Sequence, residues 1–93
     1  MDQNSVFIGT KPFMNYVTGV VMQFTVKGER EVIIKARGKF ISRAVDVAEV
    51  ATKRFLESTV SVKDIKISSE EFTNKEGRNV RVSAIEITLA KKE

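Results

Sequence analysis

The spacing of apolar residues changes repeatedly between the period of a strand and the period of a helix, and this order constrains the fold more than any other feature. A short apolar run over residues 5–8 predicts a buried strand. Residues 31–37 alternate, with Val32, Ile34 and Ala36 on one face, which predicts a half-buried strand. Helical spacing fills the gap between these two segments and returns after the second one.

Pro12 suits the first turn of a helix, and the apolar stripe after it predicts a helix that ends near Gly28. This stripe consists of Phe13, Val17, Val20, Val21 and Phe24. A second helix is predicted over residues 40–56. The core stripe expected for it consists of Ile41, Ala44, Val45, Ala48, Ala51 and Phe55. Phe40 and Val47 lie off this stripe, and self-association would explain the surplus apolar surface.

From residue 60 onward, two apolar segments flank a polar stretch at residues 74–77, which predicts a hairpin with a charged tip. The apolar phase slips twice, which indicates either bulges or strands buried on both faces. The predicted order is β-α-β-α-β-β in one domain, residues 1–93. We expect an α+β fold in which two helices cover one face of a mixed four-stranded sheet.

The chain has no histidine and no cysteine, so the commonest general base, the commonest metal ligand and the thiolate nucleophile are absent. Asp46 and Glu49 share a helix face, but Arg43 and Lys53 lie at spacings that neutralise them. We therefore expect no enzyme, cofactor, metal site or small-molecule substrate. The lack of cysteine favours a cytoplasmic protein, and no apolar run approaches the roughly 20 residues that cross a bilayer.

The net charge of +4 comes from the first half of the chain. Residues 1–45 carry seven Lys or Arg against three Asp or Glu, whereas residues 46–93 carry nine of each sign. This asymmetry favours a polyanionic partner, although a basic surface that only aids solubility is the alternative.

Lys11 stands beside the N-terminus of the first predicted helix, where the helix dipole disfavours a cation unless an anion joins it. A phosphate there would meet the ammonium and backbone N–H groups, with Asn15 as a neutral donor nearby. A second cluster without any acid consists of Lys35, Arg37, Lys39 and Arg43. Because both crossovers leave the same edge of the sheet, we expect Lys11 and this cluster to be neighbours.

The hairpin adds Lys75, Arg78 and Arg81 at or near its tip, where a narrow arm would follow a groove between phosphate rows. A charged tip that only blunts a sheet edge is the alternative. The phenylalanines mostly fit the apolar stripes, and only Tyr16 is expected to face outward. Phosphate contacts are therefore expected to dominate, with low sequence specificity.

Two segments resemble the signatures of the Alba family. Residues 8–17 read Ile-Gly-Thr-Lys-Pro-Phe-Met-Asn-Tyr-Val and are similar to its Ile-Gly-Lys-Lys-Pro followed by Met-Asn-Tyr-Val. Residues 34–46 read Ile-Lys-Ala-Arg-Gly-Lys-Phe-Ile-Ser-Arg-Ala-Val-Asp and resemble its Ile-Lys-Ala-Arg-Gly-Arg-x-Ile-Ser-Lys-Ala-Val-Asp. The likeness extends through residues 54–56, 77–78 and 82–87, so it covers nearly the whole chain.

This resemblance implies the fold of the C-terminal domain of translation initiation factor three, and a homodimer that binds double-stranded DNA without strong sequence preference. It also implies RNA binding and a place on the chromosome or nucleoid of an archaeal cell. Nucleic-acid contacts in the family map to Lys11, Lys35, Arg37 and Lys39, and its hairpin arms reach along the minor groove. The family phenylalanine that matches Phe55 lies in contacts between dimers that assemble along DNA.

Thr10 stands where the family has the first lysine of its pair, an acetylation site in some relatives, so that regulation does not carry over. Lys39 replaces a frequent arginine, which keeps the charge and loses the bidentate fork. Two other functions stay open at this point. One is a dedicated RNA-binding subunit of a ribonucleoprotein, and the other is a protein-interaction module that uses the apolar surface of the second helix.

Overall fold

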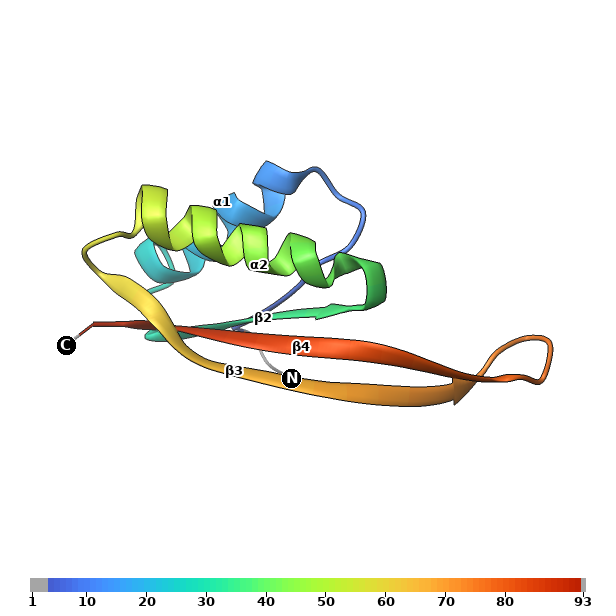
Figure 1. Ribbon diagram of the computed structural model, residues 1–93. Helices are drawn as coiled ribbons and strands as arrows, with labels where there is room; N and C mark the ends of the chain where they lie inside the picture. Colours follow the sequence, from blue (N-terminus) through green and yellow to red (C-terminus); the bar gives the residue numbers. More distant parts are fainter. Residues whose placement is uncertain (1–3, 93) are drawn as a thin grey trace.

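The structure, a computed structural model, describes residues 4–92, and within them two helices cover one face of a four-stranded sheet (Figure 1). The elements are β1 Ser5–Phe7, α1 Phe13–Thr25, β2 Glu31–Arg37, α2 Ile41–Val50, β3 Val60–Thr73 and β4 Asn79–Lys91. The strand order is β1-β2-β4-β3, with β1 and β2 parallel and β4 antiparallel to both neighbours. The predicted α+β class and element order are confirmed.

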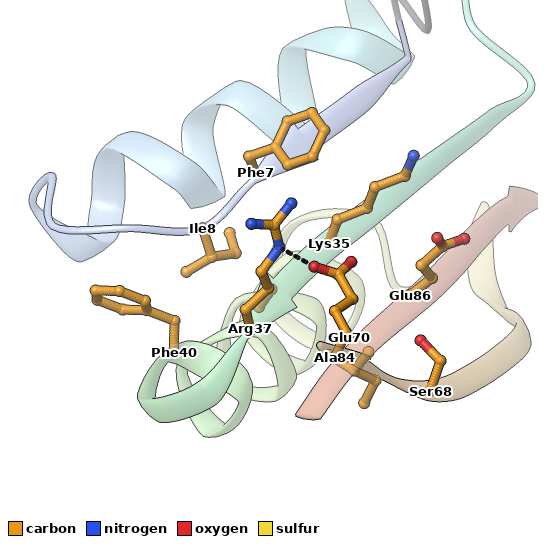
Figure 2. A pocket seen from close by; sticks show the side chains of 11 residues that line it. Phe7, Ile8, Lys35, Arg37, Phe40, Ser68, Glu70, Ala84 and Glu86 are labelled. Atoms are coloured by element: carbon orange, nitrogen blue, oxygen red, sulfur yellow. Dashed lines mark ion pairs between the residues drawn. The ribbon is translucent and has the colours of Figure 1, made fainter. Parts of the chain in front are cut away.

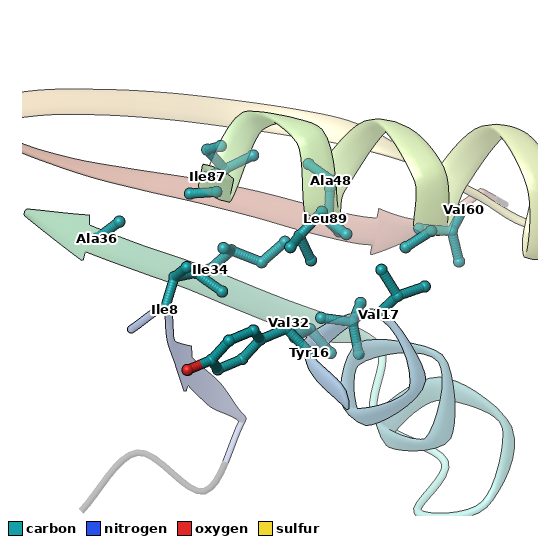
Figure 3. Packing of buried hydrophobic residues seen from close by; sticks show 14 of the residues in the cluster. Ile8, Tyr16, Val17, Val32, Ile34, Ala36, Ala48, Val60, Ile87 and Leu89 are labelled. Carbon is teal, nitrogen blue, oxygen red and sulfur yellow. The ribbon is translucent and has the colours of Figure 1, made fainter. Parts of the chain in front are cut away.

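The alternation predicted for β2 separates the two faces of the sheet. Val32, Ile34 and Ala36 are buried beneath the helices, whereas Lys35 and Arg37 lie on the face that carries no helix. We call this second surface the open face. The buried side of β2 joins the helices and β4 in one core, part of which Figure 3 shows.

In α1, Pro12 occupies the N-cap position with a φ of −55°, so its ring suits the entry into the first turn. The predicted stripe is confirmed, because Val17, Val20 and Phe24 are buried. After the helix, Gly28 adopts a φ of +72°, a conformation that glycine reaches without the strain of a Cβ.

The second helix differs from its prediction. A 3₁₀ turn, Gly38–Phe40, precedes α2, and a π-helical segment, Ala51–Phe55, follows it. The buried residues are Ala44, Val47, Ala48, Ala51 and Thr52. The expected inward positions of Val45 and Phe55 are wrong, since these residues are 42% and 54% exposed. The buried stripe keeps Ala44, Ala48 and Ala51 from the prediction but is completed by Val47 and Thr52 in place of Val45 and Phe55. The wider turn of the π segment changes the facing of the residues that follow Ala51.

The hairpin of β3 and β4 is long, and it extends past the helices as an arm (Figure 1). Between Val62 and Asp64 the pairing register shifts, so the first predicted phase slip is a bulge at Lys63. No register shift accompanies the second slip, where Val82 lies on the open face and Ile85 faces the helices. The tip turns at Gly77, whose φ is +81°.

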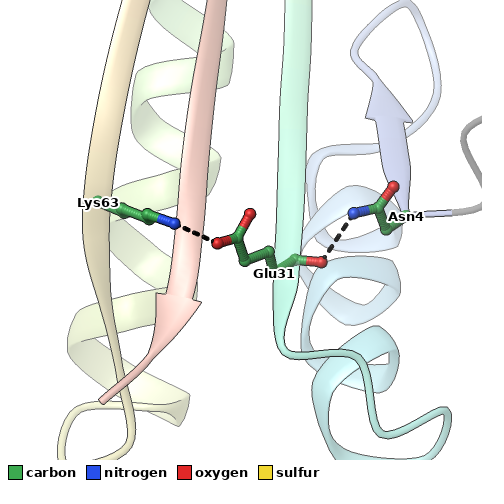
Figure 4. A network of polar contacts seen from close by, with 3 residues as sticks. All are labelled: Asn4, Glu31 and Lys63. Carbon is green, nitrogen blue, oxygen red and sulfur yellow. Dashed lines mark hydrogen bonds and ion pairs between the residues drawn. The ribbon is translucent and has the colours of Figure 1, made fainter. Parts of the chain in front are cut away.

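The bulge places the Lys63 ammonium against the carboxylate of Glu31, across the width of β4 (Figure 4). The hydrogen bond that Lys63 donates to Glu31, and then the negative charge of Glu31, raise the pKa of Lys63 above its ordinary value. Asn4 donates from Nδ2 to the backbone oxygen of Glu31 at 3.1 Å, so one residue of β2 links both edges of the sheet.

No helix within residues 4–92 has the length and apolar character needed to cross a membrane.

Candidate nucleic-acid interface

The loop between β1 and α1 carries Lys11, and the hydroxyl of Tyr16 fixes its path. The backbone N–H groups of Gly9 and Lys11 donate to this oxygen at 2.9 and 3.0 Å. The expectation that Tyr16 faces outward is wrong, because the residue is only 7% exposed. Two backbone donors give the phenolic oxygen its partners inside the fold, which makes burial of the ring favourable. A Cβ at Gly9 would lie 3.4 Å from the same oxygen, so the loop approaches Tyr16 closely at a residue without a side chain.

Arg43 joins this loop to the start of α2. Its Nη2 donates to the backbone oxygen of Lys11 at 2.9 Å, and its guanidinium lies 5.9 Å from the centre of the Phe13 ring. This bond confirms that the Lys11 loop and the chain after β2 are neighbours. Arg43 is half-buried, so it positions the loop as well as adding charge to it.

The cations of β2 occupy two places. Lys35 and Arg37 extend over the open face, where the Arg37 Nε lies 3.1 Å from a carboxylate oxygen of Glu70 (Figure 2). Gly38 then turns the chain with a φ of +54°, and Lys39 lies in the 3₁₀ turn with its ammonium 5.4 Å from the centre of the Phe40 ring. The cluster therefore bends around the end of the sheet instead of following one line.

The other predicted contact residues lie on α1 and on the arm. Asn15 is exposed and lines a shallow hollow that also borders Lys11. At the tip, the side-chain oxygen of Asn74 accepts hydrogen bonds from the N–H groups of Glu76 and Arg78 at 2.9 and 3.0 Å. Arg81 forms an ion pair with Glu71, its register partner on β3. Arg78 and Arg81 are thus presented along the exposed arm, far from α1.

The apolar residues predicted to contact another copy have different fates. Phe55 is 54% exposed, and Phe40 is partly buried against the core. Val47 has no exposed surface, so its side chain is a core residue of this chain and the expectation that it contacts a partner is wrong. Its burial follows from the shifted stripe of α2, which turns Val47 toward the sheet.

An uncovered apolar strip on β3 was missed by the sequence reasoning. Val62, Ile65 and Ile67 pair in register with three residues of β4 that are buried under the helices, yet they are 41%, 56% and 80% exposed. The helices cover the inner strands and only the first residue of β3, Val60, so this strip is left bare. The sequence held a signal for it, because four strands offer more apolar residues than two helices can cover.

Phe7 was also missed. It was assigned to the core with the other phenylalanines, but it is 64% exposed on the open face. Strict alternation was the signal: Val6 and Ile8 are in phase with the core, and the residue between them has to point the other way.

The described part of the chain contains no group of three or more acidic residues placed to hold a metal ion. Its hollows are shallow and lined by mixed polar and apolar side chains, which differs from the enclosed pocket of a small-molecule enzyme.

Residues 4–69 match the model of the family described as Alba. The chain belongs to the Alba family. The DNA/RNA-binding protein Alba 1 of Archaeoglobus fulgidus is 61% identical over 92 residues, which are 99% of this chain and 100% of that protein. The DNA/RNA-binding protein Alba of Nanoarchaeum equitans is 60% identical over 88 residues, 94% of this chain and 97% of that one. Among solved structures, Alba from Thermoplasma volcanium matches with a TM-score of 0.85 at 45% identity, covering 94% of this chain and 99% of that chain.

Proposed function

We propose that this Alba-family chain is a non-enzymatic chromatin protein that binds double-stranded DNA, and RNA, through phosphate contacts and without strong sequence preference. One observation carries the proposal: Arg43 ties the loop of Lys11 to the chain that carries Arg37 and Lys39, so cations from two crossovers gather at one end of the sheet. Relatives more than half identical over nearly the full chain are named DNA/RNA-binding proteins, which supports the same ligands here.

Binding would proceed by replacing the counterions of a phosphate backbone. Lys11, Lys39 and Arg37 offer flexible or forked donors at the end of the sheet, and Lys35 adds charge on the open face. The arm carries Arg78 and Arg81 away from this body, which suits contact with a neighbouring groove of the duplex. Such a function requires a location in the cytoplasm, in association with the nucleoid.

A dimer is part of the proposal. The apolar strip of β3 consists of large side chains that are exposed on the face of the sheet that the helices otherwise cover. A second copy of the chain would bury them. Two copies would present two arms and two basic ends to one duplex. Phe55, together with Phe40, is then left for contacts between dimers along DNA.

The test is a salt series of equilibrium binding to duplexes of unrelated sequence. We expect the logarithm of affinity to fall linearly with the logarithm of salt concentration, with a slope of about −0.9 for each neutralised phosphate. Lys11→Ala, Arg37→Ala and Lys39→Ala should weaken binding to every duplex by similar factors. A flat salt response, or loss at one sequence alone, contradicts the proposal. Competition between duplex DNA and folded RNA measures which ligand the chain prefers.

A further inference from the structure

We propose a second nucleic-acid site on the open face of the sheet, where an unpaired base of a single strand stacks on Phe7. This inference rests on the proposed function, because it assigns a further class of nucleic acid to the same chain. The site shares Lys35 and Arg37 with the phosphate contacts proposed above and adds an aromatic ring on the open face.

Phe7 is an exposed ring set among charges. The residue is 64% exposed on the edge strand β1, and its register partner Lys35 holds its ammonium 5.5 Å from the ring centre. A phenylalanine in this position has no share in the core, which Val6 and Ile8 on either side supply. An exposed aromatic ring beside a cation is the usual platform for a nucleobase followed by its phosphate.

A hollow of about 520 Å³ lies beside this ring, and Figure 2 shows its lining. Arg37 and Lys35 project into it from β2, and Ser68, Glu70 and Glu86 line it from β3 and β4. The hollow thus combines a ring face, two cations and several hydrogen-bond acceptors. A nucleotide has matching parts: a flat base, a phosphate and exocyclic amino groups.

Base pairing decides which nucleic acid fits. Inside a duplex, both faces of each base are covered by neighbouring pairs and its Watson–Crick edge is occupied, so stacking on Phe7 would require unpairing. An unpaired strand meets no such barrier. Carboxylates accept hydrogen bonds only, so Glu70 and Glu86 favour bases with amino groups, and an adenine strand is expected to bind more tightly than a uracil strand.

The first experiment separates stacking from apolar contact. Phe7→Leu keeps an apolar side chain and removes the ring, so affinity for an eight-nucleotide adenine RNA, measured by fluorescence anisotropy, should fall about 5- to 150-fold. Phe7→Trp should bind that RNA at least as tightly as the original chain. Val26→Ala is the control, since it removes apolar surface from a comparably exposed residue that does not line the hollow and belongs to none of the proposed contact surfaces.

The second experiment observes the stack directly. The chain contains no tryptophan, so Phe7→Trp introduces a single indole whose emission reports on its surroundings. Single-stranded RNA should quench this emission, and a blunt duplex should leave it unchanged. Running the series with single-stranded DNA as well as RNA shows whether the 2′-hydroxyl contributes, and quenching by either strand supports the site.

Three results would overturn the inference. Single-strand affinity unchanged by Phe7→Leu removes the site while leaving the proposed function intact, provided that the variant still binds duplex DNA. Indole emission that single strands leave unmoved does the same. A loss of dimer mass in sedimentation for Phe7→Leu assigns the open face to protein contact instead. Failure of the original chain to bind duplex DNA, by contrast, contradicts the proposed function itself.

Discussion

The hydroxyl oxygen of Tyr16 controls the position of a lysine five residues earlier. It accepts hydrogen bonds from the N–H groups of Gly9 and Lys11, while Arg43 donates a hydrogen bond to the carbonyl oxygen of Lys11 from the other side. Both backbone groups of Lys11 are therefore engaged, and its side chain is presented from a fixed point. A cation held in this way loses less conformational entropy when it meets a phosphate than one on a free loop.

Removing this oxygen tests whether Tyr16 acts through Lys11. Tyr16→Phe leaves two N–H groups without their acceptor, so we expect a loss of about 1–3 kcal/mol in the free energy of unfolding. Duplex affinity should fall severalfold, and it should fall little further when Tyr16→Phe is added to Lys11→Ala. A double-mutant cycle of binding free energies, with chemical denaturation for stability, measures both. Thr25→Ala removes a different hydroxyl bond at the far end of α1 and should leave affinity unchanged. Additive losses in the cycle would reduce Tyr16 to a structural role.

The sequence predicted that Lys11 lies in this loop, but it did not predict the hydrogen bonds that hold the backbone of Lys11 in place. An aromatic residue early in a helix is equally compatible with the core and with solvent. Tyr16 is buried because its hydroxyl oxygen accepts hydrogen bonds from two backbone N–H groups, in a loop whose path depends on tertiary structure. The same applies to Arg43, whose partner lies 32 residues away. Charge could be read from the residues, whereas the bonds that orient it could not.

At the scale of elements, β2 and α1 followed their apolar periods, and α2 did not. The hydroxyl of Thr52 donates to the backbone oxygen of Ala48 at 2.8 Å, and the chain continues as a π-helical segment in which Leu56 donates to Ala51 at 3.0 Å. A side chain that bonds its own backbone competes with the regular ladder, and the residue spacing alone gives no sign of which will win. Phe55 is exposed as a result.

The arm holds an acidic residue against one of the candidate DNA contacts. The Arg37 Nε lies 3.1 Å from a carboxylate oxygen of Glu70. A phosphate that binds Arg37 therefore has to displace Glu70. Glu70→Gln should therefore raise duplex affinity about two- to fivefold and steepen the salt slope, because the freed guanidinium and the lost negative charge both favour phosphate. Stability should change by less than about 1 kcal/mol, as both side chains of the pair are largely exposed.

Glu57→Gln is the control for that variant, since it removes the same charge at the opposite end of β3 from the arm. Anisotropy titrations of both variants at several salt concentrations separate a local release of Arg37 from a general change in net charge. Equal gains for the two variants would show that Glu70 does not restrain Arg37.

At the scale of the whole molecule, the helices and the sheet do not match in width. The molecule measures 47 × 25 × 23 Å, and its long axis follows a hairpin that the helices cover only in part. Exposed β-branched residues on an edge strand invite pairing or burial, so a chain of this shape either associates or aggregates unless the edge is protected. The bulge at Lys63 and the many charged neighbours on β3 limit disordered pairing, which leaves an ordered partner as the way to bury the strip.

Ile67→Glu tests that the strip joins two copies. Ile67 is 80% exposed within one chain, so the substitution should leave the fold and its far-ultraviolet spectrum intact, while burying a carboxylate in the interface should dissociate a dimer. Sedimentation equilibrium is expected to give a mass near 10.4 kDa for the variant and about twice that for the original chain. Ser61→Glu adds the same charge to the open face of the same strand and should remain dimeric. Dissociation should also reduce the salt slope toward half, because one basic end instead of two meets each duplex. A dimer that survives Ile67→Glu would move the interface away from β3, and the two arms would then no longer extend from a shared center.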